Sequence, residues 1–173
     1  MIIQFCGLSG AGKTTIANKV KSLLAQRGLK CEVIDGDAYR KKLCADLDFS
    51  RAGRNENIRR LAFVADVLAR NGIIPIICAI NPYEDIRQEI EVAYSNVMTV
   101  YINCNMDVLI QRDTKQLYRK AMLPAGHPDR ICNLSGVNDP FETPANPHLI
   151  IHTDTETEDA SAQNLLAFIL SIK

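Results

Sequence analysis

The sequence lacks an excess of charge of either sign, because its 20 lysines and arginines are balanced by 20 aspartates and glutamates. Such a protein has no overall field that would attract nucleic acid or an anionic membrane, so any anion must be held by a few locally placed residues. No apolar run in the sequence approaches the roughly 18 residues of a membrane-spanning helix. We therefore expect a small-molecule partner, with no nucleic acid and no membrane.

Paired cysteine spacings are also missing. The six cysteines form no CxxC or Cys/His pattern, and several lie in apolar runs, where a free thiol packs as a small hydrophobic side chain. This argues against both structural zinc and a disulfide framework. The start of the chain shows no basic region and no cleavage signal of a leader peptide. We expect a reduced, cytoplasmic protein.

No internal repeat is visible, and 173 residues are about the size of one domain, so we expect a single domain over residues 1–173. Short apolar runs alternate with amphipathic stretches. This alternation predicts an α/β fold in three layers, with a mostly parallel, doubly wound sheet flanked by helices. Strands are predicted at residues 2–6, 31–34, 73–80, 98–103 and 149–152, and helices at 14–26, 55–70, 85–94, 106–120 and 159–172.

Prolines interrupt this pattern in two places. Pro75 lies inside the predicted strand 73–80, which suggests a bulge or a late start of the strand. Residues 121–147 contain too many prolines and glycines for a long regular element. We interpret this segment as a lid loop rather than a disordered linker, because it keeps four apolar anchors: Ile131, Leu134, Val137 and Phe141.

Residues 7–15, GLSGAGKTT, match the phosphate-loop pattern G-x-x-x-x-G-K-[ST] between a predicted strand and a predicted helix. The glycines allow a tight turn whose N–H groups cradle phosphate oxygens at a helix N-terminus. Lys13 would reach the terminal phosphates of a nucleoside triphosphate, and the Thr14 hydroxyl would hold Mg²⁺. We predict nucleotide binding by Gly7, Ser9, Gly10, Ala11, Gly12, Lys13, Thr14 and Thr15.

Two acids, Asp35 and Asp37, follow the predicted strand 31–34, at the edge where open α/β sheets bind their ligands. One acid could orient Mg²⁺ and the other could accept a proton from an attacking hydroxyl. The alternative is a solvated turn that caps a helix. We predict Lys13, Asp35 and Asp37 as catalytic residues, and Thr14 and Asp35 as metal ligands.

Arginines are dense between residues 51 and 60. The planar guanidinium group pairs with phosphate or sulfate oxygens, which suggests a second, anionic substrate opposite the triphosphate. Residues at helical spacing cannot all share one side, so we expect two or three to be functional and the rest solvated. A later basic group could neutralise a moving phosphoryl group or form a solvated helix end; it comprises Arg112, Lys115, Arg119 and Lys120.

Six segments, in order along the chain, resemble the adenylylsulfate kinase family. They are GLSGAGKT (7–14), DGDAYR (35–40), DFSRAGRNENIRR (48–60), NPYED (81–85), QRDTKQLYRKA (111–121) and SGVNDPFETPANP (135–147). That family moves the terminal phosphate of ATP to the ribose 3′-hydroxyl of adenosine 5′-phosphosulfate. The resemblance implies a P-loop kinase fold that uses ATP and Mg²⁺, and it suggests a homodimer.

The resemblance also implies roles on the acceptor side. Arg40, Arg54 and Asn57 would hold the phosphosulfate end of the acceptor, and Phe49 would stack on its base. Arg112 would lie near the adenine of ATP.

The sequence departs from the family pattern mainly on this acceptor side. The family's Asp-Arg before ENIRR is Gly53-Arg54, so an acidic residue beside the acceptor arginines is missing. In the lid, a lysine becomes Cys132 and an aromatic wall becomes Leu134, which removes a base contact of about 1 kcal/mol. The family's Ser-Pro after the buried strand is Asn81-Pro82.

We therefore predict a kinase for adenosine 5′-phosphosulfate, and two alternatives stay open. The same reaction could act on another 5′-modified nucleotide, such as a cytidine diphosphoramidate in capsule biosynthesis, because Leu134 alters the base pocket. The chain could also be a nucleotide-binding regulatory protein that has lost catalysis, since the acceptor motif is changed.

Overall fold

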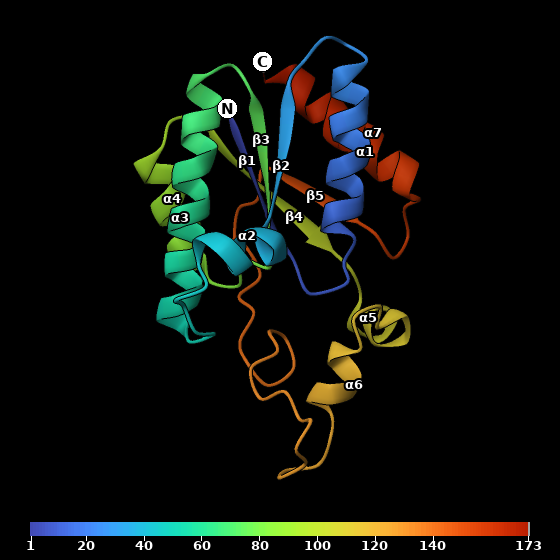
Figure 1. Ribbon diagram of the computed structural model, residues 1–173. Helices are drawn as coiled ribbons and strands as arrows, with labels where there is room; N and C mark the ends of the chain where they lie inside the picture. Colours follow the sequence, from blue (N-terminus) through green and yellow to red (C-terminus); the bar gives the residue numbers. More distant parts are fainter. Residues whose placement is uncertain (173) are drawn as a thin grey trace.

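The computed structural model describes residues 1–172, and these residues form a five-stranded sheet between two layers of helices (Figure 1). The strand order is β2-β3-β1-β4-β5, and every neighbouring pair is parallel. This confirms the predicted three-layer α/β fold. The strands are β1 (Ile2–Cys6), β2 (Cys31–Asp35), β3 (Ile74–Cys78), β4 (Val97–Asn103) and β5 (Leu149–His152).

Two helices cover each face of the sheet. On one face lie α1 (Lys13–Ala25) and α7 (Glu158–Ser171), and on the other lie α3 (Arg51–Arg70) and α4 (Glu84–Ala93) (Figure 1). The central strand β1 supplies side chains to both hydrophobic cores: Ile3 and Phe5 pack on the α1 side, and Ile2 packs on the α3 side. Burial on both faces explains why this strand is almost continuously apolar.

The carboxyl edge of the sheet carries short helices that the sequence did not fully predict. Helix α2 (Gly36–Leu43) was foreseen only in the alternative that the acids at 35 and 37 cap a helix, and it begins where the Asp35 carboxylate accepts hydrogen bonds from the N–H groups of Asp37 and Ala38. Helix α3 begins at Arg51 rather than at residue 55, because Ser50 caps it. Both differences arise from side-chain caps that start a helix without an apolar stripe.

The prediction of one helix over residues 106–120 is wrong. The chain forms α5 (Met106–Arg112) and α6 (Leu117–Ala121), separated by a turn in which Asp113 and Gln116 have φ angles of 24° and 56°. The Asp113 carboxylate accepts hydrogen bonds from the N–H groups at the start of α6. This turn moves the intervening residues, including Lys115, out of a helix and toward the end of the sheet.

Residues 121–147 contain no long helix or strand, as predicted, and they extend beyond the carboxyl edge of the sheet (Figure 1). Leu134 is buried in the α1-side core, while Val137 is 36% exposed. Pro75 fits within β3 because the ladder with β1 begins only at Ile76.

Among residues 1–172, no helix combines the length and the apolar character needed to cross a membrane.

Candidate active site

The phosphate loop joins β1 to α1 and is shaped by glycine. Gly7 has a φ of 151°, and a β-carbon at this position would overlap the carbonyl oxygen of Ile102. A larger residue would therefore push the loop away from β4. The Lys13 Nζ donates hydrogen bonds to the carbonyl oxygens of Gly7 and Leu8 at 2.9 and 2.7 Å, so this side chain folds back across the loop.

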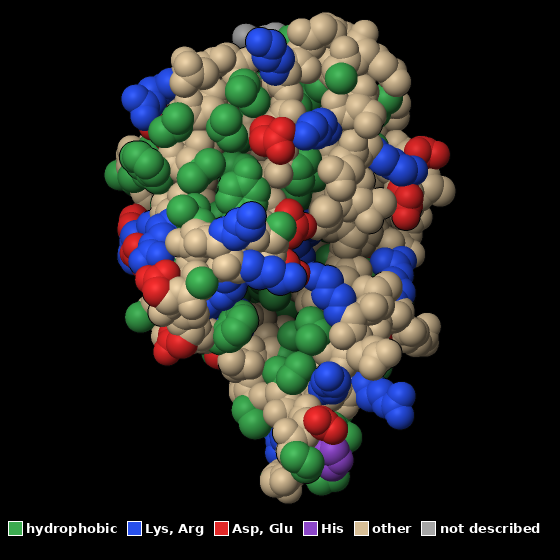
Figure 2. Space-filling model, in the orientation of Figure 1, with side chains coloured by type: hydrophobic (Ala, Val, Ile, Leu, Met, Phe, Trp, Pro, Cys, Tyr) green, Lys and Arg blue, Asp and Glu red, His purple; other side chains and the backbone are tan. Residues whose placement is uncertain are grey.

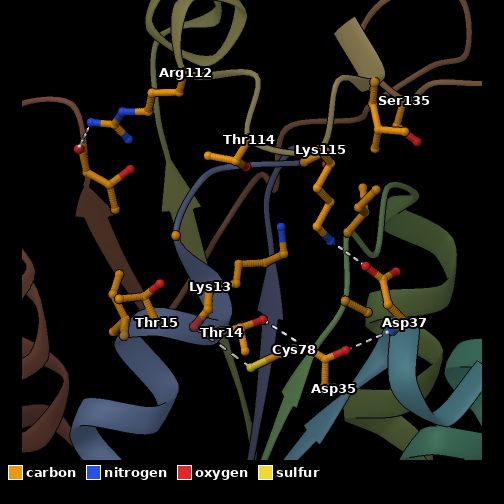
Figure 3. Close-up of a pocket in the computed structure, with 18 of the residues that line it drawn as sticks. Lys13, Thr14, Thr15, Asp35, Asp37, Cys78, Arg112, Thr114, Lys115 and Ser135 are labelled. Carbon is orange, nitrogen blue, oxygen red and sulfur yellow. Dashed lines mark hydrogen bonds and ion pairs between the residues drawn. The ribbon is translucent and has the colours of Figure 1, made fainter. Parts of the chain in front are cut away.

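The Thr14 hydroxyl and the Asp35 carboxylate face each other at the start of α1 (Figure 3). The Thr14 Oγ1 donates to Asp35 Oδ2 at 2.8 Å, while Asp35 Oδ1 accepts from two backbone N–H groups at 3.0 Å. Within residues 1–172 there is no cluster of three or more His, Cys, Asp or Glu that could hold a metal alone. Two adjacent oxygen donors nevertheless fit Mg²⁺, which is commonly held by one or two protein oxygens together with substrate phosphates and water.

Asp37 points into the same space and meets Lys115 from the opposite side (Figure 3). The Lys115 Nζ donates a hydrogen bond to Asp37 Oδ2, which joins two residues 78 positions apart in the chain. The Asp37 side chain is 75% exposed, so it remains accessible from the cavity. Sequence reasoning placed Lys115 in a basic group but not among the site residues, because its partner could not be foreseen.

Across the cavity, Phe49 lies between two arginines. The guanidinium carbon of Arg40 is 4.2 Å from the centre of the Phe49 ring, and that of Arg54 is 5.4 Å away. Arg54 also donates to the Phe49 carbonyl oxygen at 3.0 Å and to the Asn133 carbonyl oxygen at 2.5 Å. These contacts hold Arg54 between the start of α3 and the lid segment.

Arg54 does have an acidic partner, although the family's acid at position 53 is absent. The Arg54 Nε lies 3.4 Å from Asp139 Oδ2, and the Tyr83 hydroxyl donates to the same carboxylate oxygen at 3.2 Å. The acid is missing from position 53, as the sequence shows, but Arg54 still has a carboxylate beside it. The partner comes from the lid segment, which is distant in sequence and was not linked to Arg54 by any local pattern.

A cavity of about 960 Å³ joins these groups into one site. This volume is at the upper end of the range for small-molecule sites. Figure 2 shows lysine and arginine side chains gathered across the middle of this face, above the lid segment. The predicted residues in the cavity wall are Ser9, Gly10, Gly12, Lys13, Thr14, Thr15, Asp35, Asp37, Phe49, Arg54, Arg112 and Leu134.

Four predicted residues do not line this cavity. Gly7 and Ala11 belong to the phosphate loop but are absent from the cavity wall, and Ala11 is fully buried in the core. Arg40 is not in the cavity wall, but its guanidinium group lies against the Phe49 ring, which is. Asn57 is buried in α3, and its Oδ1 has no hydrogen-bond partner among residues 1–172.

Sequence reasoning also left out residues that do line the cavity. Ser135 is 1% exposed, and its Oγ lacks a hydrogen-bond partner among the described residues. Its signal was present, since it is the first residue of the segment 135–147 that carries the family resemblance. Thr114 and Lys115 also line the cavity, and both lie in the segment 111–121 that carries the resemblance. Cys78 lines it as well and had no signal in the sequence.

Arg112 lies at the phosphate-loop side of the cavity (Figure 3). Its Nη2 donates to the Thr153 carbonyl oxygen at 2.9 Å, just after β5. This bond holds the guanidinium group near the last strand and the start of α7. The planar, charged guanidinium group of Arg112 therefore lies beside the part of the cavity that borders the phosphate loop.

Comparison with known proteins gives a consistent result. The profile of the family described as adenylylsulphate kinase matches residues 1–152. The adenylyl-sulfate kinase of Rippkaea orientalis is 43% identical over 163 residues, covering 94% of this chain and 87% of the relative. That of Chloroflexus aurantiacus is 41% identical over 167 residues, covering 96% of this chain and 87% of the relative.

A solved structure shows the same likeness in three dimensions. The Mycobacterium tuberculosis APS kinase CysC, in complex with AMPPNP and APS, superposes with a TM-score of 0.89 at 34% identity, covering 98% of this chain and 96% of the other. The family and the kinase class predicted from the sequence are thereby confirmed. The chain belongs to the adenylylsulfate kinase family.

Proposed function

We propose that the chain transfers the terminal phosphoryl group of ATP to the ribose 3′-hydroxyl of adenosine 5′-phosphosulfate. The observation that carries this proposal is a single cavity with a phosphate loop on one side and Phe49 with Arg54 on the other. Asp35 and Asp37 lie in the wall of the same cavity. The names of the related kinases support the choice of both substrates.

On the donor side, the phosphate loop and Lys13 would hold the phosphates of ATP, and Arg112 would lie beside its adenine. Thr14 and Asp35 would hold Mg²⁺, since their oxygens lie 2.8 Å apart at the end of the loop. When bound, the metal would draw charge from the transferring phosphoryl group. Both Asp35 oxygens already accept hydrogen bonds, so Asp35 is better suited to ordering the metal than to taking a proton.

On the acceptor side, Asp37 would accept the proton of the 3′-hydroxyl as it attacks. Its Oδ1 makes no hydrogen bond within the described residues, and its Oδ2 is held by Lys115. The Lys115 ammonium group would then lie near the negative charge that spreads over the moving phosphoryl group. Arg54, which lines the cavity, would hold the phosphosulfate end, and Arg40 would act on it through Phe49. Most of the rate would come from positioning two substrates in line.

We further propose that the whole chain is one kinase domain with a lid at residues 121–147. Leu134 and Ser135 of this segment line the cavity, and Gly136 lies against Leu8 of the phosphate loop. These contacts support closure of the lid over bound nucleotide, which would exclude water from the transfer. The homodimer stays a prediction, which sedimentation analysis would test. The cytoplasmic location, where ATP is available, also stays a prediction, and cell fractionation would test it.

ATP binding is expected to take up a proton near pH 8. Burial lowers the pKa of Lys13 from 10.5 to about 8, and bound phosphate would restore its charge and raise that pKa again. Because the free-protein pKa is the lower one, affinity should be full below pH 8 and should fall as the pH rises through that value. Titration calorimetry at pH 8.5, in two buffers with different ionisation enthalpies, measures the uptake. Lys13→Met is the control, and a wild-type protein that takes up no proton between pH 7 and 9 would contradict the assignment.

A panel of acceptors tests the proposed function. ADP release by the wild-type chain is measured with adenosine 5′-phosphosulfate, with its 3′-deoxy analogue and with a cytidine diphosphoramidate. We expect the highest kcat/KM for adenosine 5′-phosphosulfate and no acceptor-dependent release with the 3′-deoxy compound. Leu134→Phe should lower the acceptor KM by about fivefold, because a restored aromatic face contributes about 1 kcal/mol.

The other outcomes of this panel separate the alternatives. A preference for the cytidine acceptor would identify another 5′-modified nucleotide as the substrate. ATP binding without turnover of any acceptor would favour a regulatory protein that has lost catalysis. Either result would overturn the proposal.

A further inference from the structure

We propose that Asp48 is a positioning residue for the acceptor site, and that it supplies in space the carboxylate that the family pattern places at position 53. This inference rests on the proposed function, because it concerns how the acceptor is held. Asp48 is exposed and does not line the cavity, so it would act through Phe49 and Arg54, which do.

The first observation is steric. Gly53 lies in the first turn of α3, and a β-carbon there would overlap Asp48 Oδ1 and lie 2.5 Å from the Asp48 carbonyl oxygen. One of these two atoms belongs to the backbone and cannot move aside as the end of a flexible side chain can. The turn containing Asp48 therefore fills the space that a side chain at position 53 would need. Glycine at 53 and this placement of Asp48 depend on each other.

The second observation is a relay of hydrogen bonds. Asp48 Oδ1 accepts from the backbone N–H of Ser50 at 3.1 Å and from its hydroxyl at 2.6 Å. The Ser50 Oγ in turn accepts from the Gly53 N–H at 3.1 Å, which caps α3. The hydrogen bonds from Ser50 hold the pKa of the Asp48 carboxyl below its usual range. The charged carboxylate accepts the serine O–H and thus leaves the serine oxygen free to accept from the Gly53 N–H, as a capping group requires.

The third observation is that the turn containing Asp48 also contains Phe49. Phe49 lies between Asp48 and Ser50, and its ring lies against Arg40 and Arg54. Arg40 donates to the carbonyl oxygens of Leu47 and Asp48, and Arg54 donates to that of Phe49. Both arginines are therefore bonded to the backbone that the Asp48 carboxylate fixes. Without that carboxylate, the Phe49 ring and the guanidinium groups of Arg40 and Arg54 would no longer be held together.

Kinetics of two variants and one control test the role of Asp48. We expect Asp48→Ala to raise the KM for adenosine 5′-phosphosulfate by about tenfold, with the KM for ATP and the kcat at saturating acceptor changed by less than about twofold. Asp48→Asn keeps an oxygen that can accept from Ser50, and it should restore most of the acceptor affinity. Asp46→Ala is the matched control in the same loop, since Asp46 pairs with Arg60 outside the cavity.

A reciprocal exchange tests the link between Asp48 and Gly53. Gly53→Asp alone should raise the acceptor KM by at least about tenfold, because its β-carbon meets the Asp48 turn. Adding Asp48→Gly should recover much of that loss, since a glycine turn can move away from the new side chain. If the fold-changes in acceptor KM of the two single variants simply multiply in the double variant, the proposal that Asp48 replaces the acid of position 53 is overturned.

The results separate this inference from the proposed function. Normal acceptor turnover by the wild-type chain, together with an unchanged acceptor KM in Asp48→Ala, would overturn only the role of Asp48. No acceptor turnover by the wild-type chain would overturn both.

Discussion

Replacing Asp37 with asparagine is expected to lower the kcat for phosphoryl transfer by about 10²–10⁴-fold while changing the Kd for ATP by less than about twofold. Asparagine keeps the size of the side chain but cannot take the proton of an attacking hydroxyl. Asp37 contacts Lys115 rather than the phosphate loop, so donor binding should survive. Single-turnover transfer with the acceptor saturating, together with calorimetry for ATP, separates the two effects.

Asp46→Asn is the matched control for this experiment. Asp46 is also a carboxylate paired with a cation, Arg60, but it does not line the cavity. Its loss should leave kcat within about twofold of the wild type, because exposed ion pairs contribute little. Turnover of Asp37→Asn within about tenfold of the wild type would show that another group takes the proton. Turnover abolished by this substitution would also exclude a purely regulatory protein.

Arg87→Met is expected to have the largest effect on stability, lowering the free energy of unfolding by about 3 kcal/mol. Arg87 is 1% exposed and donates to the Asn81 carbonyl oxygen at 2.7 Å and to the Glu142 carbonyl oxygen at 2.6 Å. It also pairs with Glu84 at 2.5 Å. Methionine would fill much of the volume but would leave these oxygens without a donor. Urea unfolding and the melting temperature, expected to fall by about 10 °C, measure the change.

Arg70→Met on α3 is the matched control for stability. Arg70 pairs with Asp66, but its side chain is 65% exposed, so its loss should cost less than about 1 kcal/mol. The prediction for Arg87 fails if the two variants unfold at the same urea concentration. Because Arg87 joins the segment after β3 to the lid segment, we also expect Arg87→Met to weaken acceptor binding more than Arg70→Met does.

The strands were predictable because burial on both faces of a parallel sheet leaves continuous apolar runs, as in β1. The helices that depend on a single polar cap were not. Helix α2 has no apolar stripe in GDAYRKKL, and its start depends on the Asp35 carboxylate. The break between α5 and α6 occurs at Asp113 and Gln116, which carry no glycine or proline signal. Local rules of composition therefore could not place either feature.

The place of the phosphate loop in the cavity wall could be predicted because its pattern is local. Nine consecutive residues, 7–15, contain both the turn and the lysine, and geometry then brings Asp35 to Thr14. The acceptor side depends on contacts between distant segments, such as Asp37 with Lys115 and Arg54 with Asp139. The sequence showed that position 53 is glycine where the family pattern has an acid. Only the structure shows that Asp48 occupies the adjoining space.

Identification of the product tests the central claim most directly. The purified chain is incubated with Mg²⁺, ATP and adenosine 5′-phosphosulfate, and the nucleotide product is analysed by mass spectrometry and phosphorus NMR. We predict one new phosphomonoester, coupled to the ribose 3′ proton, for each ADP released. Release of inorganic phosphate without a new nucleotide, or a phosphate on a position other than the 3′ oxygen, would contradict the proposed reaction.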